Sequence, residues 1–219
     1  MEKKDLIAHS PVRYFDNATS AGLKDGEMGL VTAKKGLGKT SVLVQFGINS
    51  LLNDKALVHV SFDQQSSNVI AWYSSIMAEV AKKKNINLDE VSEEIVRNRT
   101  ILNFNQETFT LPKVVNTLKA LKEGGIKIGS VVVDGLDLAK TSKADLDCFA
   151  DFVKAEKMTA WFSYTNEAAD LKGTLDADKL ADFATVGHLA ASGNALSLTI
   201  LKNGDGKANL DAKTLLFTK

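Results

Sequence analysis

A glycine-rich segment between an apolar run and an amphipathic one constrains this chain more than any other feature. Residues 33–40 read Ala-Lys-Lys-Gly-Leu-Gly-Lys-Thr. They match the pattern G-x-x-x-x-G-K-[ST], except that Ala33 replaces the first glycine. The residues before the segment, 28–33, predict a buried strand, and residues 40–52 predict a helix, which is the context that the pattern requires. The sequence therefore predicts a phosphate-binding loop at the N-terminus of a helix.

The residues of this loop have distinct roles in phosphate chemistry. Gly36 and Gly38 allow the backbone angles that close approach to a phosphate demands. We expect backbone N–H groups to surround the phosphates, Lys39 to reach the outer phosphates and the Thr40 hydroxyl to bind Mg²⁺. The expected contact residues are Ala33, Lys34, Lys35, Gly36, Leu37, Gly38, Lys39, Thr40 and Ser41. A chance match in a lysine-rich turn is the alternative, and the flanking strand and helix argue against it.

The rest of the chain alternates short β-branched runs with helical patterns. Strands are expected at residues 28–33, 56–62, 100–104, 130–133, 159–164 and 195–202, with another near 215–217. Helices are expected at residues 40–52, 66–84, 89–97 and 111–122, and again after Ser142. This alternation predicts a single α/β domain over residues 1–219, with a mostly parallel sheet between helices. The sequence Asn-Gly-Asp-Gly at 203–206 predicts the turn of a C-terminal antiparallel hairpin between 195–202 and 215–217.

Two carboxylates follow apolar strands on the C-terminal side of the loop. Asp134 comes directly after Val131–Val133, where a carboxylate can hold Mg²⁺ through its water shell. Asp137, three residues further on, is expected to be a surface turn residue. Asp63 follows the second strand and would either orient water against a γ-phosphate or, with Ser66, cap the next helix. The residues alone leave both roles of Asp63 open.

Composition argues against several other classes of protein. The chain has 27 basic and 27 acidic residues, so its zero net charge gives no overall attraction to nucleic acid or anionic lipid. Acidic residues outnumber basic ones in the later loops, as Glu167, Asp170, Asp176, Asp178 and Asp182 against Lys172 and Lys179 show. A DNA-binding role is therefore disfavoured. One cysteine excludes an internal disulfide, and no apolar run predicts a signal peptide or membrane span, so we expect a cytoplasmic protein without a membrane partner.

Several segments resemble the RecA-like ATPases, especially the branch that contains KaiC, the RadA proteins and DnaB-type helicases. Residues 21–27 resemble that branch's Gly-Gly-Leu-x-x-Gly-Glu lead-in to the first strand. Residues 33–40 resemble its Walker A motif, and Val131–Asp134 resembles its Walker B strand. Residues 201–204 resemble a Lys-Asn-Arg motif on the terminal hairpin. The resemblance implies a three-layer α/β RecA-like P-loop core, ATP and Mg²⁺ as cofactors, and a homo-oligomeric ring or filament.

The departures from this family pattern concern hydrolysis. Asp63 stands where these families have a catalytic glutamate. The resemblance therefore implies that Asp63 is the catalytic carboxylate, although its side chain is shorter than that of glutamate. In these families the strand that corresponds to residues 159–164 usually carries a polar sensor residue. Here Thr165 or Asn166 would have to serve in that role. Gly204 takes the place of an arginine that reaches a neighbouring subunit's γ-phosphate, which leaves Lys202 as the basic catalytic residue of that motif. A missing arginine finger can cost several powers of ten in rate.

Three functions are consistent with these observations. The first is an ATP-binding protein that hydrolyses ATP slowly or acts as a nucleotide-dependent regulator. The second is a module that has lost hydrolysis and works as a nucleotide-binding switch or scaffold. The third is a small-molecule kinase, which usually closes an arginine-bearing lid over the phosphates. No arginine follows Arg99, so the third is disfavoured.

Overall fold

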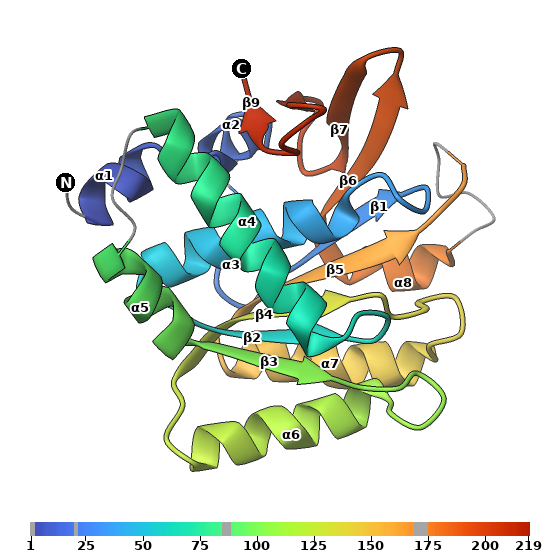
Figure 1. The fold of residues 1–219 in the computed structure, drawn as a ribbon. Helices are drawn as coiled ribbons and strands as arrows, with labels where there is room; N and C mark the ends of the chain where they lie inside the picture. Colours follow the sequence, from blue (N-terminus) through green and yellow to red (C-terminus); the bar gives the residue numbers. More distant parts are fainter. Residues whose placement is uncertain (1–2, 20–21, 85–88, 169–174) are drawn as a thin grey trace.

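The computed structural model describes residues 3–19, 22–84, 89–168 and 175–219. Within these residues it contains one nine-stranded sheet with the order β3-β2-β4-β5-β1-β6-β7-β8-β9 (Figure 1). The strands are β1 (Met28–Ala33), β2 (Ala56–Ser61), β3 (Arg99–Asn103), β4 (Ile128–Asp134), β5 (Thr159–Thr165), β6 (Phe183–Ser192), β7 (Ala195–Lys202), β8 (Lys207–Leu210) and β9 (Phe217–Thr218). Strands β1 to β6 are parallel, whereas β7, β8 and β9 are antiparallel to their neighbours.

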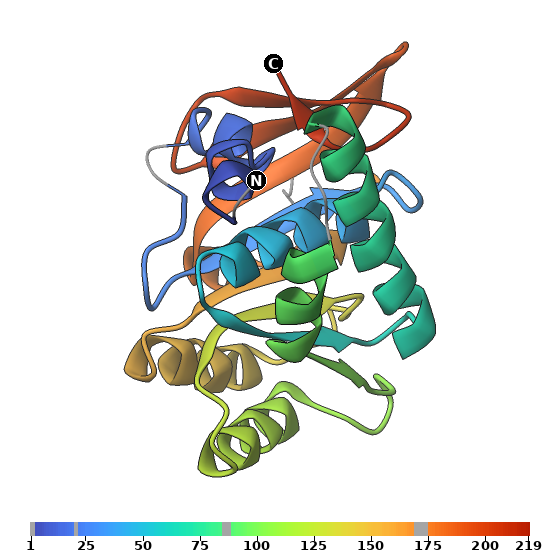
Figure 2. The ribbon, with the colours of Figure 1, turned by 60° about the vertical axis from the view of Figure 1, so that its left-hand side comes forward.

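Helices cover both faces of the sheet and produce three layers (Figures 1 and 2). They are α1 (Lys3–Ala8), α2 (Val12–Asp16), α3 (Lys39–Leu52), α4 (Ser66–Lys84), α5 (Asp89–Arg97), α6 (Leu111–Glu123), α7 (Lys143–Ala155) and α8 (Ala177–Ala181). Helices α6 and α7 lie on one face, and α3 and α4 lie on the other. The α/β three-layer class predicted from the sequence is confirmed. Among the described helices, none has the length and apolar character needed to cross a bilayer.

Strand β4 shows why the central strands are continuous apolar runs. Val131 and Val133 are fully buried in the cluster that contains α6 and α7, whereas Val132 is fully buried in the cluster that contains α3 and α4. Both faces of a parallel sheet are covered in this way, so apolar residues do not alternate with polar ones. The C-terminal ends of the strands are left at one edge, where the loops carry the polar residues.

The antiparallel part of the sheet differs in detail from the prediction. A C-terminal hairpin is present, but β7 pairs with β8 rather than with residues 215–217. Only the end of that segment is a strand, β9, which pairs with β8 from the other side. Residues 211–214 form a turn because the Asp211 side chain accepts hydrogen bonds from the Lys213 and Thr214 amides. The prediction does not include strand β6, because small and polar residues interrupt its apolar pattern. It also does not include the short helices α1, α2 and α8.

Gly29 in β1 allows two central strands to pack closely. A Cβ atom at Gly29 would lie 2.3 Å from Cζ3 of Trp161, a ring carbon in the neighbouring strand. We expect Gly29→Ala to lower the free energy of unfolding by about 1–3 kcal/mol, because the ring has to move within a packed core. Urea denaturation measures this change. Gly129→Ala is the matched control, since Gly129 is only half-buried and its Cβ would lie 3.0 Å from its nearest neighbour, Cβ of Lys55. Equal losses in both variants would contradict the prediction.

Candidate phosphate-binding site

The loop between β1 and α3 has the backbone geometry that the sequence predicts. Gly36 and Gly38 have φ angles of 82° and 96°, in the left-handed region that favours glycine. Gly38 is the N-cap of α3, and its side-chain-free backbone brings the helix N-terminus to the loop. The positive end of the helix dipole and the free N–H groups of the first turn therefore face this loop. This is an arrangement that attracts an anion.

Lys39, the first residue of α3, folds its ammonium group back over the loop. Its Nζ atom donates hydrogen bonds to the carbonyl oxygens of Ala33 and Lys34, both at 3.2 Å. Burial lowers the pKa of Lys39, and three nearby carboxylates raise it. A phosphate would offer this ammonium a charged acceptor in place of two neutral carbonyls, and charge-assisted hydrogen bonds are the stronger kind.

Asp134 ends β4 and is held by two hydroxyl groups. Its side chain is buried, and Thr40 Oγ1 donates to Oδ2 at 2.7 Å while Ser163 Oγ donates to Oδ1 at 2.5 Å. Burial raises the pKa of Asp134, and the hydrogen bonds from Ser163 and Thr40 oppose that rise. The backbone N–H of Gly135 donates to Ser163 Oγ at 2.9 Å, which fixes the serine. The two residues expected to hold a metal are thus in direct contact.

The residues at this point fit a magnesium ion. Mg²⁺ binds oxygen ligands, keeps several waters, and is often held by one or two side chains together with substrate phosphates. The Thr40 hydroxyl and the Asp134 carboxylate supply such oxygens beside the loop. No group of three or more His, Cys, Asp or Glu side chains in the described ranges is placed to hold a metal by itself. A site completed by phosphate oxygens and water fits this donor set.

Asp63 lies just beyond β2, against the loop that follows β4. A Cβ atom on Gly135, which has a φ of 78°, would lie 2.3 Å from Cγ of Asp63, so only glycine allows this approach. Desolvation raises the pKa of Asp63, and the negative charge of Asp134 raises it further. The amides of residues 68 and 69 bind the Gln65 carbonyl. Within the described chain no amide of the first turn of α4 binds the Asp63 carboxylate, so the geometry favours the cleft role over the helix cap.

These residues line a cleft of about 620 Å³ at the C-terminal ends of the strands. This volume lies within the range of roughly 300–1,000 Å³ that is common for small-molecule sites. The loop contributes Lys35, Gly36, Gly38, Lys39 and Thr40. The other walls include Asp63, Trp72, Gln106, Asp134, Asp137, Ser163, Tyr164, Thr165 and Leu215. Five of the predicted phosphate-binding residues, the metal pair and Asp63 therefore meet in one cleft, whereas Lys202 does not line it.

Some predicted contact residues lie beside this cleft rather than in its walls. Ala33 is buried at the end of β1, and the Lys34 side chain is exposed. Ser41 is fully buried, and its hydroxyl has no hydrogen-bond partner in the described chain. Of the two sensor candidates, Thr165 lines the cleft. Asn166 is buried, and its side chain bonds to the backbone of residue 168.

Lys202 is held within its own chain at the end of β7. Its Nζ atom donates to the carbonyl oxygens of Leu180 and Ala181, at 3.3 and 3.1 Å, where α8 ends. A lysine is favourable at this negative end of a helix. Gly204 has a φ of 143°, and a Cβ atom there would lie 2.9 Å from the Ala18 carbonyl oxygen. The motif therefore does not reach the cleft of its own chain, and a role across a subunit interface stays a prediction.

Ser163 is a site residue that the sequence-based prediction does not include. It stands in β5 between two aromatic residues, Phe162 and Tyr164, and its short hydroxyl side chain is buried. Buried polar groups are nearly always hydrogen-bonded. A serine between two aromatic residues of a buried strand is therefore the signal that could have indicated a partner, which proves to be Asp134.

The segment 211–217 is a second unexpected part of the site. Leu215 has a φ of 57°, and its side chain lies beside Gly38 of the phosphate-binding loop. A Cβ atom at Gly38 would be 3.1 Å from Cδ1 of Leu215. Gln45 in α3 fixes this segment, because its Nε2 donates to the Leu215 carbonyl at 2.8 Å and its Oε1 accepts from the Phe217 amide at 3.0 Å. The helix that carries the phosphate-binding loop is thereby joined to the C-terminal segment.

The fold and the cleft together define a P-loop nucleotide-binding protein, since a glycine loop, a lysine and a threonine–aspartate pair meet at the C-terminal edge of a parallel sheet. A family model described as "ATPase: KaiC" matches residues 8–189. Because that match spans most of the chain, the protein belongs to the KaiC family of ATPases. The family confirms the RecA-like core and makes this an ATP-binding RecA-like protein. A search among curated proteins finds no match.

Proposed function

We propose that this protein binds Mg-ATP and hydrolyses it slowly, as a nucleotide-dependent regulator. The observation that carries the proposal is the contact of Thr40 with Asp134 at the base of the loop, beside Asp63. Lys39 and the N–H groups of residues 33–41 hold the phosphates. Thr40 and Asp134 would hold Mg²⁺, and the ion would supply positive charge against the phosphate oxygens. Asp63 orients the water that attacks the γ-phosphorus and accepts its proton. The bond between the γ-phosphorus and the β–γ bridging oxygen breaks, so ADP leaves with that oxygen and inorganic phosphate forms.

Two features support a low rate of hydrolysis. Asp63 is one methylene shorter than glutamate, so it holds the water less closely to the γ-phosphate. The described residues that line the cleft include no arginine, although an arginine finger contributes a factor of roughly 10³–10⁵ in related reactions. In a ring or filament of identical chains, Lys202 would supply a cation from the neighbouring copy once it leaves the α8 carbonyls.

The second candidate is a nucleotide-binding switch or scaffold without hydrolysis. The same absence of arginine from the described cleft walls favours it. Both candidates need the phosphate-binding loop, and they differ in whether Asp63 affects the rate of phosphate release.

Phosphate release by the Asp63→Ala variant distinguishes the two candidates. We expect this variant to bind Mg-ATP with an affinity within about threefold of the wild type, because the proposed role of Asp63 is to hold the attacking water and not the phosphates. Its rate of phosphate release should fall at least about tenfold, since positioned bases contribute roughly 10²–10⁴. Calorimetric titration and a phosphate-release assay measure the two effects. Asp63→Glu is the matched variant and should release phosphate faster than the wild type. Release that is undetectable or independent of residue 63 would support the scaffold.

A further inference from the structure

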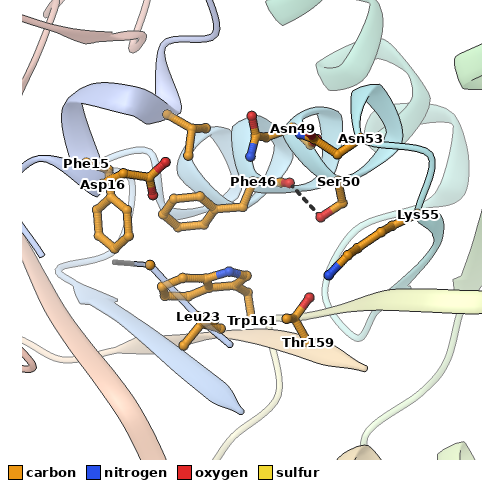
Figure 3. A pocket seen from close by; sticks show the side chains of 12 residues that line it. Phe15, Asp16, Leu23, Phe46, Asn49, Ser50, Asn53, Lys55, Thr159 and Trp161 are labelled. Atoms are coloured by element: carbon orange, nitrogen blue, oxygen red, sulfur yellow. Dashed lines mark hydrogen bonds between the residues drawn. The ribbon is translucent and has the colours of Figure 1, made fainter. Parts of the chain in front are cut away.

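A second cleft lies at the opposite edge of the sheet from the phosphate-binding loop (Figure 3). Its volume is about 330 Å³, and its walls come from α2, the last turns of α3, Lys55 and the first half of β5. Helix α3 begins at the phosphate-binding loop and ends at this cleft. At about 1.5 Å per residue, its 14 residues separate the two sites by roughly 20 Å.

Three aromatic rings give this cleft a rigid apolar wall. The rings of Phe46 and Trp161 are stacked with centroids 4.2 Å apart, and Phe15 meets both of them edge-on at 4.8 and 5.5 Å. Phe15 is 1% exposed, Phe46 4% and Trp161 6%, so these rings are anchored in the core. Their edges are therefore fixed in position whether or not the cleft is filled.

The Trp161 side chain is 6% exposed, and its indole N–H is open to the cleft. No group in the described chain accepts a hydrogen bond from it, although the nitrogen of a buried tryptophan usually finds one. Figure 3 shows this nitrogen on the ring edge that faces the cleft. The Asn49 side chain also extends toward the cleft, with its Oδ1 accepting from Ser10 Oγ at 2.9 Å. The cleft thus presents fixed donors to an accepting group.

Opposite charges stand at the two ends of the aromatic wall, as Figure 3 shows. Asp16 projects from the end of α2, and no described side chain pairs with its carboxylate. Although Asp16 is at the exposed rim, desolvation by its neighbours raises its pKa. At the other end the Lys55 ammonium points into the cleft, with Asp25 at 2.7 Å as its partner at the surface. A cation is therefore favoured at one end and an acceptor at the other.

We propose that this second cleft binds a small zwitterion with an apolar body. Its ammonium group would pair with Asp16, its methylene groups would lie along the aromatic wall, and its carboxylate would accept hydrogen bonds from Trp161 and Lys55. The volume, at the low end of the range for small-molecule sites, limits the ligand to about the size of an amino acid. The inference stands independently of nucleotide binding, because it uses none of the residues of the first cleft.

The two tryptophans of the chain provide a direct test, since Trp72 lines the first cleft and Trp161 the second. A ¹⁵N-labelled full chain gives two indole N–H resonances, which Trp161→Phe or Trp72→Phe assigns. The probe is 6-aminohexanoate, with hexylamine and hexanoate as single-charge analogues of the same length. We expect a saturable shift of the Trp161 resonance with 6-aminohexanoate, at least about tenfold weaker binding of either analogue, and no shift of the Trp72 resonance.

Asp16→Asn provides the matched test of the charged end. It should weaken binding of 6-aminohexanoate at least about tenfold and leave binding of hexanoate unchanged. Asp151→Asn, on the exposed face of α7, removes the same charge elsewhere and should change neither. The proposal is overturned if 6-aminohexanoate gives no saturable shift, if all three probes bind equally, or if Asp16→Asn binds as the wild type does. Mg-ATP should move the Trp72 resonance, so a failure of nucleotide binding is seen separately.

Discussion

Replacing Lys39 with alanine is expected to weaken Mg-ATP binding by at least about a hundredfold. The ammonium of Lys39 is folded over the loop and bonded to the carbonyl oxygens of Ala33 and Lys34. Without the Lys39 ammonium, a bound phosphate lies beside the Asp134 and Asp63 carboxylates and lacks the positive charge that Lys39 supplies. Repulsion from these groups then acts on the bound nucleotide unopposed by this side chain.

Isothermal titration calorimetry with Mg-ATP measures this loss. Lys34→Ala is the matched control, because its side chain is exposed outside the cleft while its carbonyl, which the substitution keeps, is the part that contacts Lys39. The control should bind Mg-ATP within about threefold of the wild type. Equal affinity of the wild type and Lys39→Ala would remove the phosphate-binding role of the loop.

A second large effect concerns His59, which is fully buried in β2. Its Nδ1 lies 3.0 Å from the Tyr73 hydroxyl, and its Nε2 has no hydrogen-bond partner in the described chain. Burial lowers the pKa of His59 to about 3, with a further contribution from the positive charge of Arg99. The imidazole therefore stays neutral in the folded protein at every pH near neutrality.

The pH dependence of stability follows from this lowered pKa. Between about pH 3 and pH 6.5 the unfolded chain binds a proton at residue 59 that the folded chain does not. Since the unfolded state binds more protons in this window, the free energy of unfolding falls as the pH falls through it. Above about pH 6.5 neither state binds this proton, and the full stability is present. At about pH 5 we expect a loss of about 2 kcal/mol from this residue.

Urea denaturation at about pH 7.5 and about pH 5 tests this expectation. His59→Gln is the informative variant, because a glutamine side chain has an amide that bonds to Tyr73 but does not titrate. The loss of stability between the two pH values should be smaller in this variant by about 2 kcal/mol. His188, whose pKa burial also lowers, contributes equally to both proteins and cancels in the comparison. An identical pH dependence in the two proteins would show that His59 is not the buried base that we describe.

The parts of the site that the sequence predicts well are those that are continuous along the chain. The strand, the glycine loop and the start of α3 follow one another within residues 28–52, so spacing alone indicates their arrangement. Asp134 is predictable because it ends an apolar strand downstream of a phosphate-binding loop, where a carboxylate can hold Mg²⁺. The alternation of strand and helix patterns predicts the mostly parallel sheet, and the turn residues 203–206 predict a terminal hairpin.

The parts that the sequence does not predict depend on contacts between distant segments. Ser163 becomes a site residue only because β5 lies beside β4, which brings its hydroxyl to Asp134. Strand β6 is specified by its place between β1 and β7 rather than by an apolar pattern of its own. The second cleft is built from α2, the end of α3 and β5, and no local motif in any of these segments marks it.

The contact of Gln45 with the segment 211–217 has a consequence for the order of folding. The two hydrogen bonds join residues 170 and 172 positions apart in the chain. Contacts of such long sequence separation require a large loss of chain entropy and form after local structure. The glycine loop is synthesised early, yet Leu215 reaches it only when most of the chain has emerged and docked. The wall of the cleft that Leu215 forms is thus completed in the closing steps of folding, so a partly synthesised chain carries the motif without this wall.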